Sequence, residues 1–383
     1  MLRRIAKLCV PLAAVVLLMG LSGCASVRFY VQAAVGQATL MLARRDTGAV
    51  LADPATAPDV ASKLRLVARL LRFAEAELEL PVDGRYGSFV DSEGVLLWNV
   101  VAAPEFDVAA LPRCYPIVGC AVYRGYFSRE AAEREAARLG VDHDVHIAPV
   151  AAYSTLGWFD DPILGSFLHY DEASLAELIF HELAHSVVYV RGDTAFNESF
   201  ATFVGSKGAM DWLEHNGVDT DPYTAGLAAR AAFRDFLGLW RERLATLYGR
   251  PITDEAKRRL KAAAFAAMDA CYRRHRAQLG DGRYDTAMAT PYNNARLALA
   301  AAYDDLRPAF EGLFIDVGDW PALYAEVRRL ASLSKSERRD ALALVSRSPH
   351  AAPPPVTCDA REAPSMVMAE KTVTMADASL DSS

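Results

Sequence analysis

The chain has 383 residues, of which 52% are hydrophobic and 9% aromatic, so it can bury a large core in one big domain or in two closely joined ones. This composition excludes a disordered protein, and a formal net charge of −7 excludes the basic surface of a typical nucleic-acid-binding protein. We therefore expect a folded protein with no nucleic-acid partner.

The first 23 residues have the pattern of a secretory signal peptide. A positively charged start precedes an apolar run over residues 8–20, which is too short to span a membrane and ends in the tetrapeptide LSGC at Cys24. This end resembles a bacterial lipobox, which implies cleavage before Cys24 and acylation of that residue. The mature protein would then be anchored to the lipid bilayer by acyl chains. A buried or single-pass N-terminal helix is the alternative.

The residue that follows Cys24 indicates in which membrane the lipoprotein is expected. Ala25 stands where an inner-membrane retention signal would carry Asp. The resemblance to such lipoproteins therefore implies a location in the bacterial cell envelope, on the outer membrane and facing the periplasm.

Two helical patterns follow, over residues 30–45 and 61–80, where large apolar side chains recur three or four positions apart. Pro54 and Pro58 separate the two. We expect residues 24–80 to form a helical buttress that leads away from the membrane.

The character then changes to short β-rich runs over residues 86–123, of which residues 94–101 are the clearest. An amphipathic helix is predicted over residues 127–139, opened by Ser128 as its N-cap. Further strands are predicted at residues 145–150 and 153–159. We expect a small sheet within a β-rich part that covers residues 81–170.

The clearest chemical pattern is His181-Glu182-Leu183-Ala184-His185, or HELAH. A helix turns about 100° per residue, so the two histidines lie on one face, one turn apart, and can bind the same ion. Glu182 lies beside them, where it can reach a water molecule on that ion. HExxH is the motif of zinc peptidases, with two metal ligands and a general base.

Glu198, which follows His185 by 13 residues, is the candidate third metal ligand. Its surroundings, NESFATF, suit a second helix, and Gly192-Asp193 is expected where the first helix ends and the second is capped. Two His and one Glu are a standard ligand set of catalytic zinc. The alternatives are ordinary surface residues, or a structural zinc site closed by another Cys or His, and neither residue type lies nearby.

Beyond Glu198 the chain is predicted to be almost wholly helical up to residue 346, and residues 347–383 to be a disordered tail. The metallopeptidase domain would thus span residues 24–346, with its helical part over residues 171–346. The predicted helices cover residues 225–248, 252–277, 290–304, 320–334 and 336–346.

Four cysteines lie outside the signal and the lipobox. Cys114 and Cys120 flank the turn-like stretch YPIVG and are expected to form a small disulfide loop, as an oxidising compartment allows. A redox or metal pair is disfavoured because five residues separate them. A disulfide between Cys271 and Cys358 is an open alternative.

HELAH followed by NESFATF resembles the putative bacterial aminopeptidases, zinc-dependent lipoproteins related to the gluzincin peptidases. The resemblance extends to YSTLGWFDDPIL and PYNNARL. It implies a predominantly α-helical α+β fold with a gluzincin-like core and one Zn²⁺ per chain, held by the two histidines and Glu198. Thermolysin-like gluzincins carry an Asp where this chain has Thr202, so Asp193 and Glu177 are the candidates to orient a ligand histidine.

The same resemblance implies where substrate binds. Gluzincins pair an edge strand with the substrate backbone, and GWFDDP, with Gly157 and Asp160, is the candidate strand, an ordinary edge hairpin being the alternative. The free amino group of a substrate needs an acidic or amide partner. Asp160, Asp161, Asn293 and Asn294 are the candidates, and the sequence does not choose among them.

In the expected reaction, zinc activates a water molecule and Glu182 acts as general base and then general acid. The resemblance of PYNNARL to a family motif makes Tyr292 the candidate second electrophile, a core tyrosine being the alternative. The predicted function is a zinc-dependent peptidase acting on a peptide substrate. That it is an aminopeptidase rests on the resemblance. An envelope endopeptidase or quality-control protease and a non-catalytic lipoprotein scaffold are the alternatives.

Overall fold

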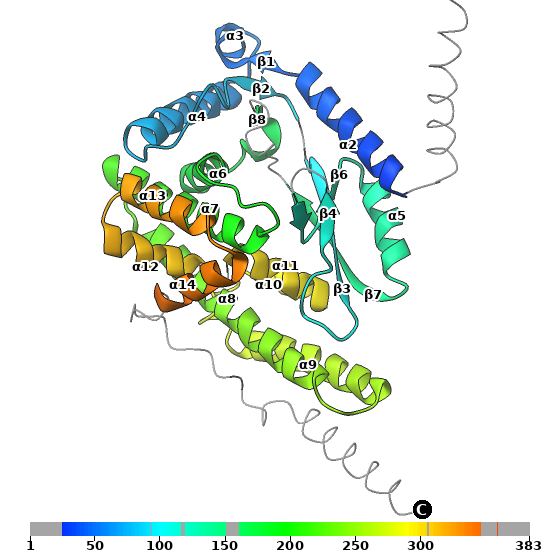
Figure 1. Ribbon diagram of the computed structural model, residues 1–383. Coiled ribbons are helices and arrows are strands. Elements are labelled where there is room, and N and C mark those ends of the chain that lie inside the picture. The colour runs from blue at the N-terminus through cyan, green and yellow to red at the C-terminus, as the bar shows by residue number, and fades with distance from the viewer. Residues whose placement is uncertain are drawn as a thin grey trace, which may run out of the picture.

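The computed structural model describes residues 25–92, 94–115, 119–150, 161–304 and 306–345, together with Cys358. It confirms a predominantly α-helical α+β fold, with a large group of helices beside a small antiparallel sheet (Figure 1). Within these residues, no helix combines the length and the apolar character that crossing a membrane requires.

The N-terminal part is helical, as predicted, but its helices begin earlier in the chain. α2 (Ala25–Leu42) and α4 (Pro58–Ala76) correspond to the two predicted helices, and α3 (Thr47–Ala52) lies between them. Pro58 opens α4 instead of merely interrupting the chain, because the first turn of a helix needs no N–H from that position.

The principal sheet has the order β6-β3-β7 and is antiparallel throughout. Its central strand, β3 (Leu97–Pro104), lies three residues later than predicted. Val100 and Ala102 on one face pack with α5 (Arg129–Leu139), and Val101 and Ala103 on the other face pack with Ala295. The predicted N-cap of α5 is confirmed, since Ser128 accepts a hydrogen bond from the Ala131 N–H.

The remaining strands are short. β6 (Arg124–Tyr126) and β7 (His143–Val150) flank β3, β4 (Arg113–Tyr115) and β5 (Gly119–Ala121) form a hairpin, and β1 (Arg45–Asp46), β2 (Ser88–Val90) and β8 (Ile163–Leu164) form a second sheet. The strand predicted at residues 153–159 lies outside the described residues.

The rest of the described chain is helical. Its helices are α6 (Glu172–Ala184), α7 (Thr194–His215), α8 (Asp221–Tyr248), α9 (Asp254–Arg274), α10 (Asp285–Ala289), α11 (Asn294–Asp304), α12 (Arg307–Val317), α13 (Trp320–Ala331) and α14 (Lys335–Val345). α12 was not among the predicted helices, although Pro308 in its first turn is typical of a helix start. α11 contacts both the principal sheet and α7, so it joins the two halves of the fold.

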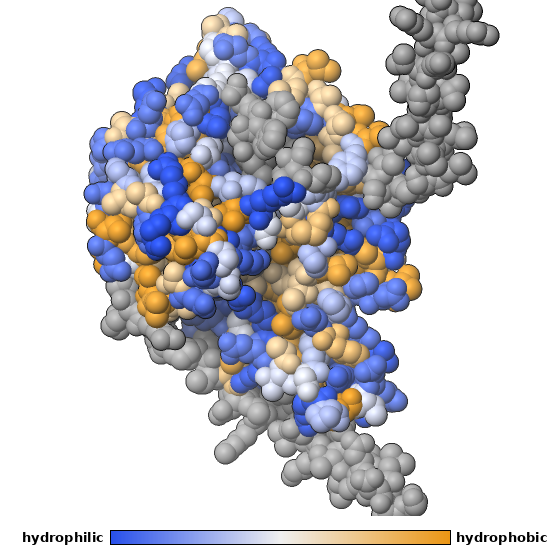
Figure 2. All heavy atoms as spheres, in the orientation of Figure 1, coloured by the Kyte–Doolittle hydropathy of each residue, from blue (hydrophilic) through white to orange (hydrophobic). Residues whose placement is uncertain are grey.

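Two hydrophobic clusters stabilise the helical half. The larger cluster surrounds α6 and α7 and includes Phe180, Phe200 and Phe310. The second lies between α8 and α9 and contains Cys358, which is disulfide-bonded to Cys271 and only 2% exposed. The tail was predicted to be disordered, and this residue is an exception because the disulfide holds it in an apolar cluster. Over the face shown in Figure 2, hydrophilic and hydrophobic residues are interspersed.

Candidate metal centre

Helix α6 carries the HELAH motif at its C-terminal end. Asp171 caps its N-terminus by accepting a hydrogen bond from the Ser174 N–H at 2.7 Å. His181 lies in the last turn and His185 is the C-cap residue. The ring centroids of the two histidines are 5.0 Å apart, as expected for side chains one helical turn apart.

Helix α7 can approach α6 closely because it presents glycines at the contact. A Cβ atom at Gly205 would lie 2.6 Å from the carbonyl oxygen of Glu177 and 3.1 Å from Cβ of His181. At Gly208, a Cβ atom would lie 2.9 Å from the ring of Phe180. Gly205 follows Glu198 by two helical turns, so both residues lie on the face of α7 that meets α6.

Asn197 fixes the loop between the two helices. Its side-chain amide donates to the Val190 carbonyl at 2.8 Å, and its side-chain oxygen accepts from the Val190 N–H, also at 2.8 Å. Asn197 precedes Glu198 in NESFATF. This role was not predicted, although an Asn beside a ligand and next to a helix start was visible in the sequence.

The three predicted ligands converge. Possible ligand atoms of His181, His185 and Glu198 all lie within 4.8 Å of one another. Oε2 of Glu198 lies 3.5 Å from Nε2 of His181 and 3.8 Å from Nε2 of His185. Two imidazoles and one carboxylate at these distances can hold a metal ion.

The electrostatics of the group suit a cation. Burial lowers the pKa of His185 to about 4, which keeps this imidazole in the neutral form that binds metals. Burial, the largest single influence, opposes the charged forms of His181 and Glu198. Their mutual hydrogen bond and the neighbouring charges together exceed it, so the pKa of His181 is raised and that of Glu198 is lowered. His181 and Glu198 therefore stabilise a positive charge between them, where an ion would bind.

An unpaired atom provides a test of this fit. Nδ1 of His185 is buried and has no hydrogen-bond partner among the described residues, while Nε2 faces Glu198. With a metal ion at Nε2, Nδ1 would carry the proton of the ring and would still lack a partner among the described residues, so this atom does not by itself indicate a metal. The residues fit a metal because two imidazoles and a carboxylate converge on one point.

Tyr86 lies close to Glu182 and was not predicted. Burial raises the pKa of Tyr86 well above its usual value, and the charges of Glu182 and Asp161 raise it further. Its backbone has a φ of 61°, which is unfavourable for a residue with a Cβ atom, and its N–H donates to the Asp161 carbonyl at 2.8 Å. Tyr86 is thus a neutral hydroxyl group within electrostatic range of the predicted general base.

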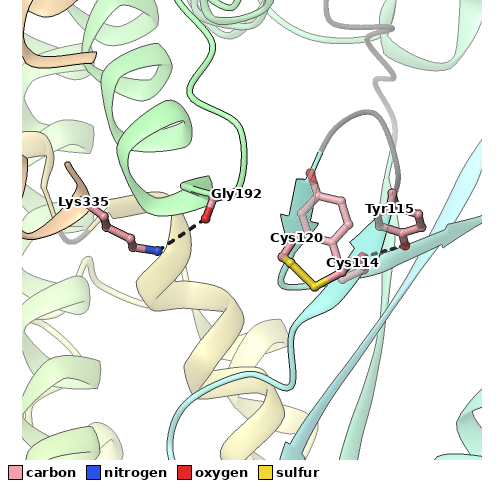
Figure 3. Close-up of a disulfide and its surroundings, with 6 residues drawn as sticks. Cys114, Tyr115, Cys120, Gly192 and Lys335 are labelled. Atoms are coloured by element: carbon pink, nitrogen blue, oxygen red, sulfur yellow. Dashed lines mark hydrogen bonds between the residues drawn. A yellow bond between two sulfur atoms is a disulfide. The ribbon is translucent and has the colours of Figure 1, made fainter. Parts of the chain in front are cut away.

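A second tyrosine, Tyr123, follows the β4–β5 hairpin by two residues and reaches the metal group. The hairpin is closed by the Cys114–Cys120 disulfide, as expected from the sequence, and faces the α6–α7 loop at Gly192 (Figure 3). The Tyr115 hydroxyl donates to the carbonyl of Tyr123 at 3.3 Å. The Tyr123 side chain in turn forms a hydrogen bond with the Glu198 carboxylate. No pattern in the sequence indicated this contact.

Glu177 and Asp193 were the candidates to orient a ligand histidine, but the main contacts of both side chains are with other residues. Glu177 accepts hydrogen bonds from Arg230 and, at 2.9 Å, from the Tyr223 hydroxyl, and its charge contributes to the raised pKa of His181. Asp193 precedes α7 but does not cap it with its side chain. Its carboxylate instead pairs with Arg338 of α14 at 2.9 Å, and both side chains are buried.

The PYNNARL residues mostly serve the scaffold. The Tyr292 ring packs with the second hydrophobic cluster, under the Arg296 guanidinium at 3.9 Å. Asn293 caps α11 by accepting from the Arg296 N–H, and its amide donates to the Val145 carbonyl. The side-chain oxygen of the buried Asn294 accepts from the Tyr248 hydroxyl, and its amide donates to the carbonyls of Pro104, at the end of β3, and Glu105. The contacts described for these three residues are therefore contacts with the scaffold, and their predicted roles in catalysis and substrate binding stay predictions.

The other predicted residues divide into two groups. Asp161 is 4% exposed and lies near Tyr86, and therefore in the neighbourhood of Glu182. Gly157, Asp160 and Cys24 lie outside the described residues.

A separate groove of about 830 Å³ lies between α4 and the segment that leads into α6, and the metal ligands do not line it.

Comparison with known families agrees with this geometry. Residues 28–342 match the model of a family described as putative aminopeptidase. The chain belongs to this family. The match includes all three ligands and Glu182, together with Tyr86 and Tyr123. No curated protein and no solved structure showed significant similarity to the chain.

Proposed function

We propose that this protein is a zinc-dependent metallopeptidase that removes residues from the amino end of peptides. The observation that carries the proposal is the convergence of His181, His185 and Glu198 beside Glu182 in a member of an aminopeptidase family. Zinc is the proposed metal because two neutral imidazoles and a carboxylate, with a base next to the first histidine, are the donor set of zinc peptidases.

Each residue has a definite task in this proposal. Zinc, when bound, supplies a Lewis acid that polarises the scissile carbonyl and activates water. Glu182 accepts the proton of the attacking water and passes it to the leaving amine. Tyr86, which stays neutral beside Glu182, is a better candidate than Tyr292 to donate a hydrogen bond to the developing oxyanion.

The decisive experiment separates metal binding from catalysis. We expect the purified protein to contain about one zinc per chain, and Glu182→Gln to keep the zinc and the melting temperature but lose about 10²- to 10⁴-fold in kcat/KM. The control is Glu133→Gln, an exposed glutamate of α5, which should retain full activity. Wild-type rates in Glu182→Gln would remove Glu182 from the mechanism. Wild-type protein that binds zinc but cleaves no peptide would favour the scaffold alternative.

The direction of attack is tested with matched peptides. An aminopeptidase needs the free α-amino group, so acetylation of the substrate should abolish cleavage. Equal cleavage of free and acetylated peptides would indicate an envelope endopeptidase instead.

We also propose that Cys24 is acylated and that the protein is held at the outer membrane, facing the periplasm. The support is the LSGC sequence and Ala25 after it. Cys24→Ser should release the protein from the acylated membrane pool, which metabolic labelling with a fatty acid measures. Equal label in the variant would show that the lipobox interpretation is wrong.

A further inference from the structure

Helix α2 is fixed to the protein by one of its faces. Gln32 donates to the Gly125 carbonyl at 3.3 Å and accepts from the Phe127 N–H at 3.0 Å, so its amide bridges the end of strand β6. On the same side, the Phe29 ring is buried, with the Arg124 guanidinium 4.4 Å from its centroid. These contacts make α2 a rigid attachment rather than a loose tether.

The opposite face of α2 is apolar and exposed to solvent. Val31 is 56% exposed, Val35 60% and Leu42 87%, and the three lie within about 40° of one another around the helix axis. Ala34 and Ala38 are also exposed and belong to the same strip, which we call the outer face. Figure 2 shows hydrophobic side chains at the edge of the molecule where Figure 1 labels α2. A continuous apolar strip of this kind usually marks a binding surface.

The charged residues beside the outer face indicate which kind of partner it binds. α2 contains no Asp or Glu, while Arg28 is exposed near one end and Arg44 and Arg45 follow the other. Tyr30, 47% exposed, lies at the edge of the strip. Cationic and aromatic residues beside an apolar strip are typical of helices that lie in the interface of an anionic bilayer. Arg45 forms an ion pair with Asp53 at 3.0 Å and is followed by Asp46, so the positive charge at the margins of the outer face comes mainly from Arg28.

We propose that the outer face of α2 lies on an anionic phospholipid surface and fixes the orientation of the metal centre relative to the membrane. The position of the helix supports this. α2 begins at Ala25, directly after the proposed acylation site Cys24, so an acyl anchor would hold the outer face against the bilayer. The inference does not depend on peptidase activity.

The test measures bilayer binding without the acyl chain. Residues 24–383 carrying Cys24→Ser keep every described element, and are mixed with vesicles of phosphatidylethanolamine and phosphatidylglycerol, then floated on a density gradient. We expect the protein to float with these vesicles, and to float at least tenfold less with pure phosphatidylcholine or when Val31→Glu and Val35→Glu are combined.

The matched control places the same two glutamates at exposed valines outside α2. Val141 is 80% exposed and Val218 43% exposed, so Val141→Glu combined with Val218→Glu adds equal charge and should leave vesicle binding unchanged. Circular dichroism and the melting temperature check that each variant folds.

Three results would overturn the inference. They are absence of flotation with anionic vesicles, equal flotation of the α2 variant, and a self-association, detected by sedimentation, that the α2 variant abolishes while vesicle binding persists. The last result would assign the outer face to a second copy of the chain.

Discussion

Replacing Gly205 with alanine should move the third ligand without touching any ligand. The new Cβ atom would lie 2.6 Å from the Glu177 carbonyl oxygen, whereas ordinary contacts begin near 3.4 Å. This oxygen belongs to the backbone of α6 and cannot rotate away. The helices must therefore separate locally by up to about 0.8 Å, the difference between these two distances. Metal–ligand distances tolerate only about 0.2 Å, so Glu198, two turns away on the same face of α7, would lose its position.

The expected magnitudes follow from two opposing effects. Overpacking at a helix contact costs about 1–3 kcal/mol, and replacing glycine by alanine within a helix returns about 1 kcal/mol. Gly205→Ala should therefore change the free energy of unfolding by between about 0 and −2 kcal/mol, a modest loss. Zinc affinity should fall more, by about 10- to 100-fold, as it does when the support of a ligand is disturbed.

Gly238→Ala provides the control. Gly238 lies within α8, and a Cβ atom there would have no neighbour within 4 Å, so only the favourable helix effect remains. Zinc competition with a fluorescent chelator and urea unfolding of the apoprotein measure both quantities. If Gly205→Ala binds zinc as tightly as wild type and is stabilised as much as Gly238→Ala, the close helix contact does not position Glu198.

Three further predictions concern other parts of the fold. Tyr123→Phe removes the hydrogen bond to the third ligand and should weaken zinc binding about 10- to 100-fold in chelator competition, while the control Tyr126→Phe should not; equal affinities would refute a positioning role. Arg338→Met leaves the buried Asp193 with only the more distant and largely exposed Lys335, 3.6 Å away, and should cost up to about 3–5 kcal/mol in urea unfolding, part of which Asp193→Asn should restore in the double variant; an additive further loss would contradict this. Burial lowers the pKa of His146 to about 4, so below pH 6.5 the unfolded chain takes up a proton that the folded chain refuses. The contribution of His146 to stability is therefore complete above pH 6.5 and should fall by at most about 3 kcal/mol between pH 6.5 and 4, and His146→Gln should make that part of the urea-unfolding profile less steep; an unchanged slope would exclude a contribution from His146.

The sequence alone was sufficient for features encoded by local periodicity. His181 and His185 lie one turn apart in any helix, and the apolar repeats of α4 and α8 predicted those helices to within a few residues. The predominantly helical α+β class followed from the same repeats. Short segments were less predictable, because strands of two or three residues, such as β1 and β8, have no period to detect.

Contacts between distant parts of the chain depended on the tertiary structure. Asp193 and Arg338 are 145 residues apart, and no local pattern indicates that an apparent helix cap is half of a buried ion pair. Tyr123 reaches Glu198 because a disulfide-closed hairpin packs on the loop after α6, a geometry that requires both elements to be folded. In PYNNARL, the helix cap formed by Asn293 and the packing of Tyr292 in the second hydrophobic cluster likewise became visible only in the folded chain. A sequence determines which side chains share a helical turn, whereas the packing of the whole chain decides which turns meet.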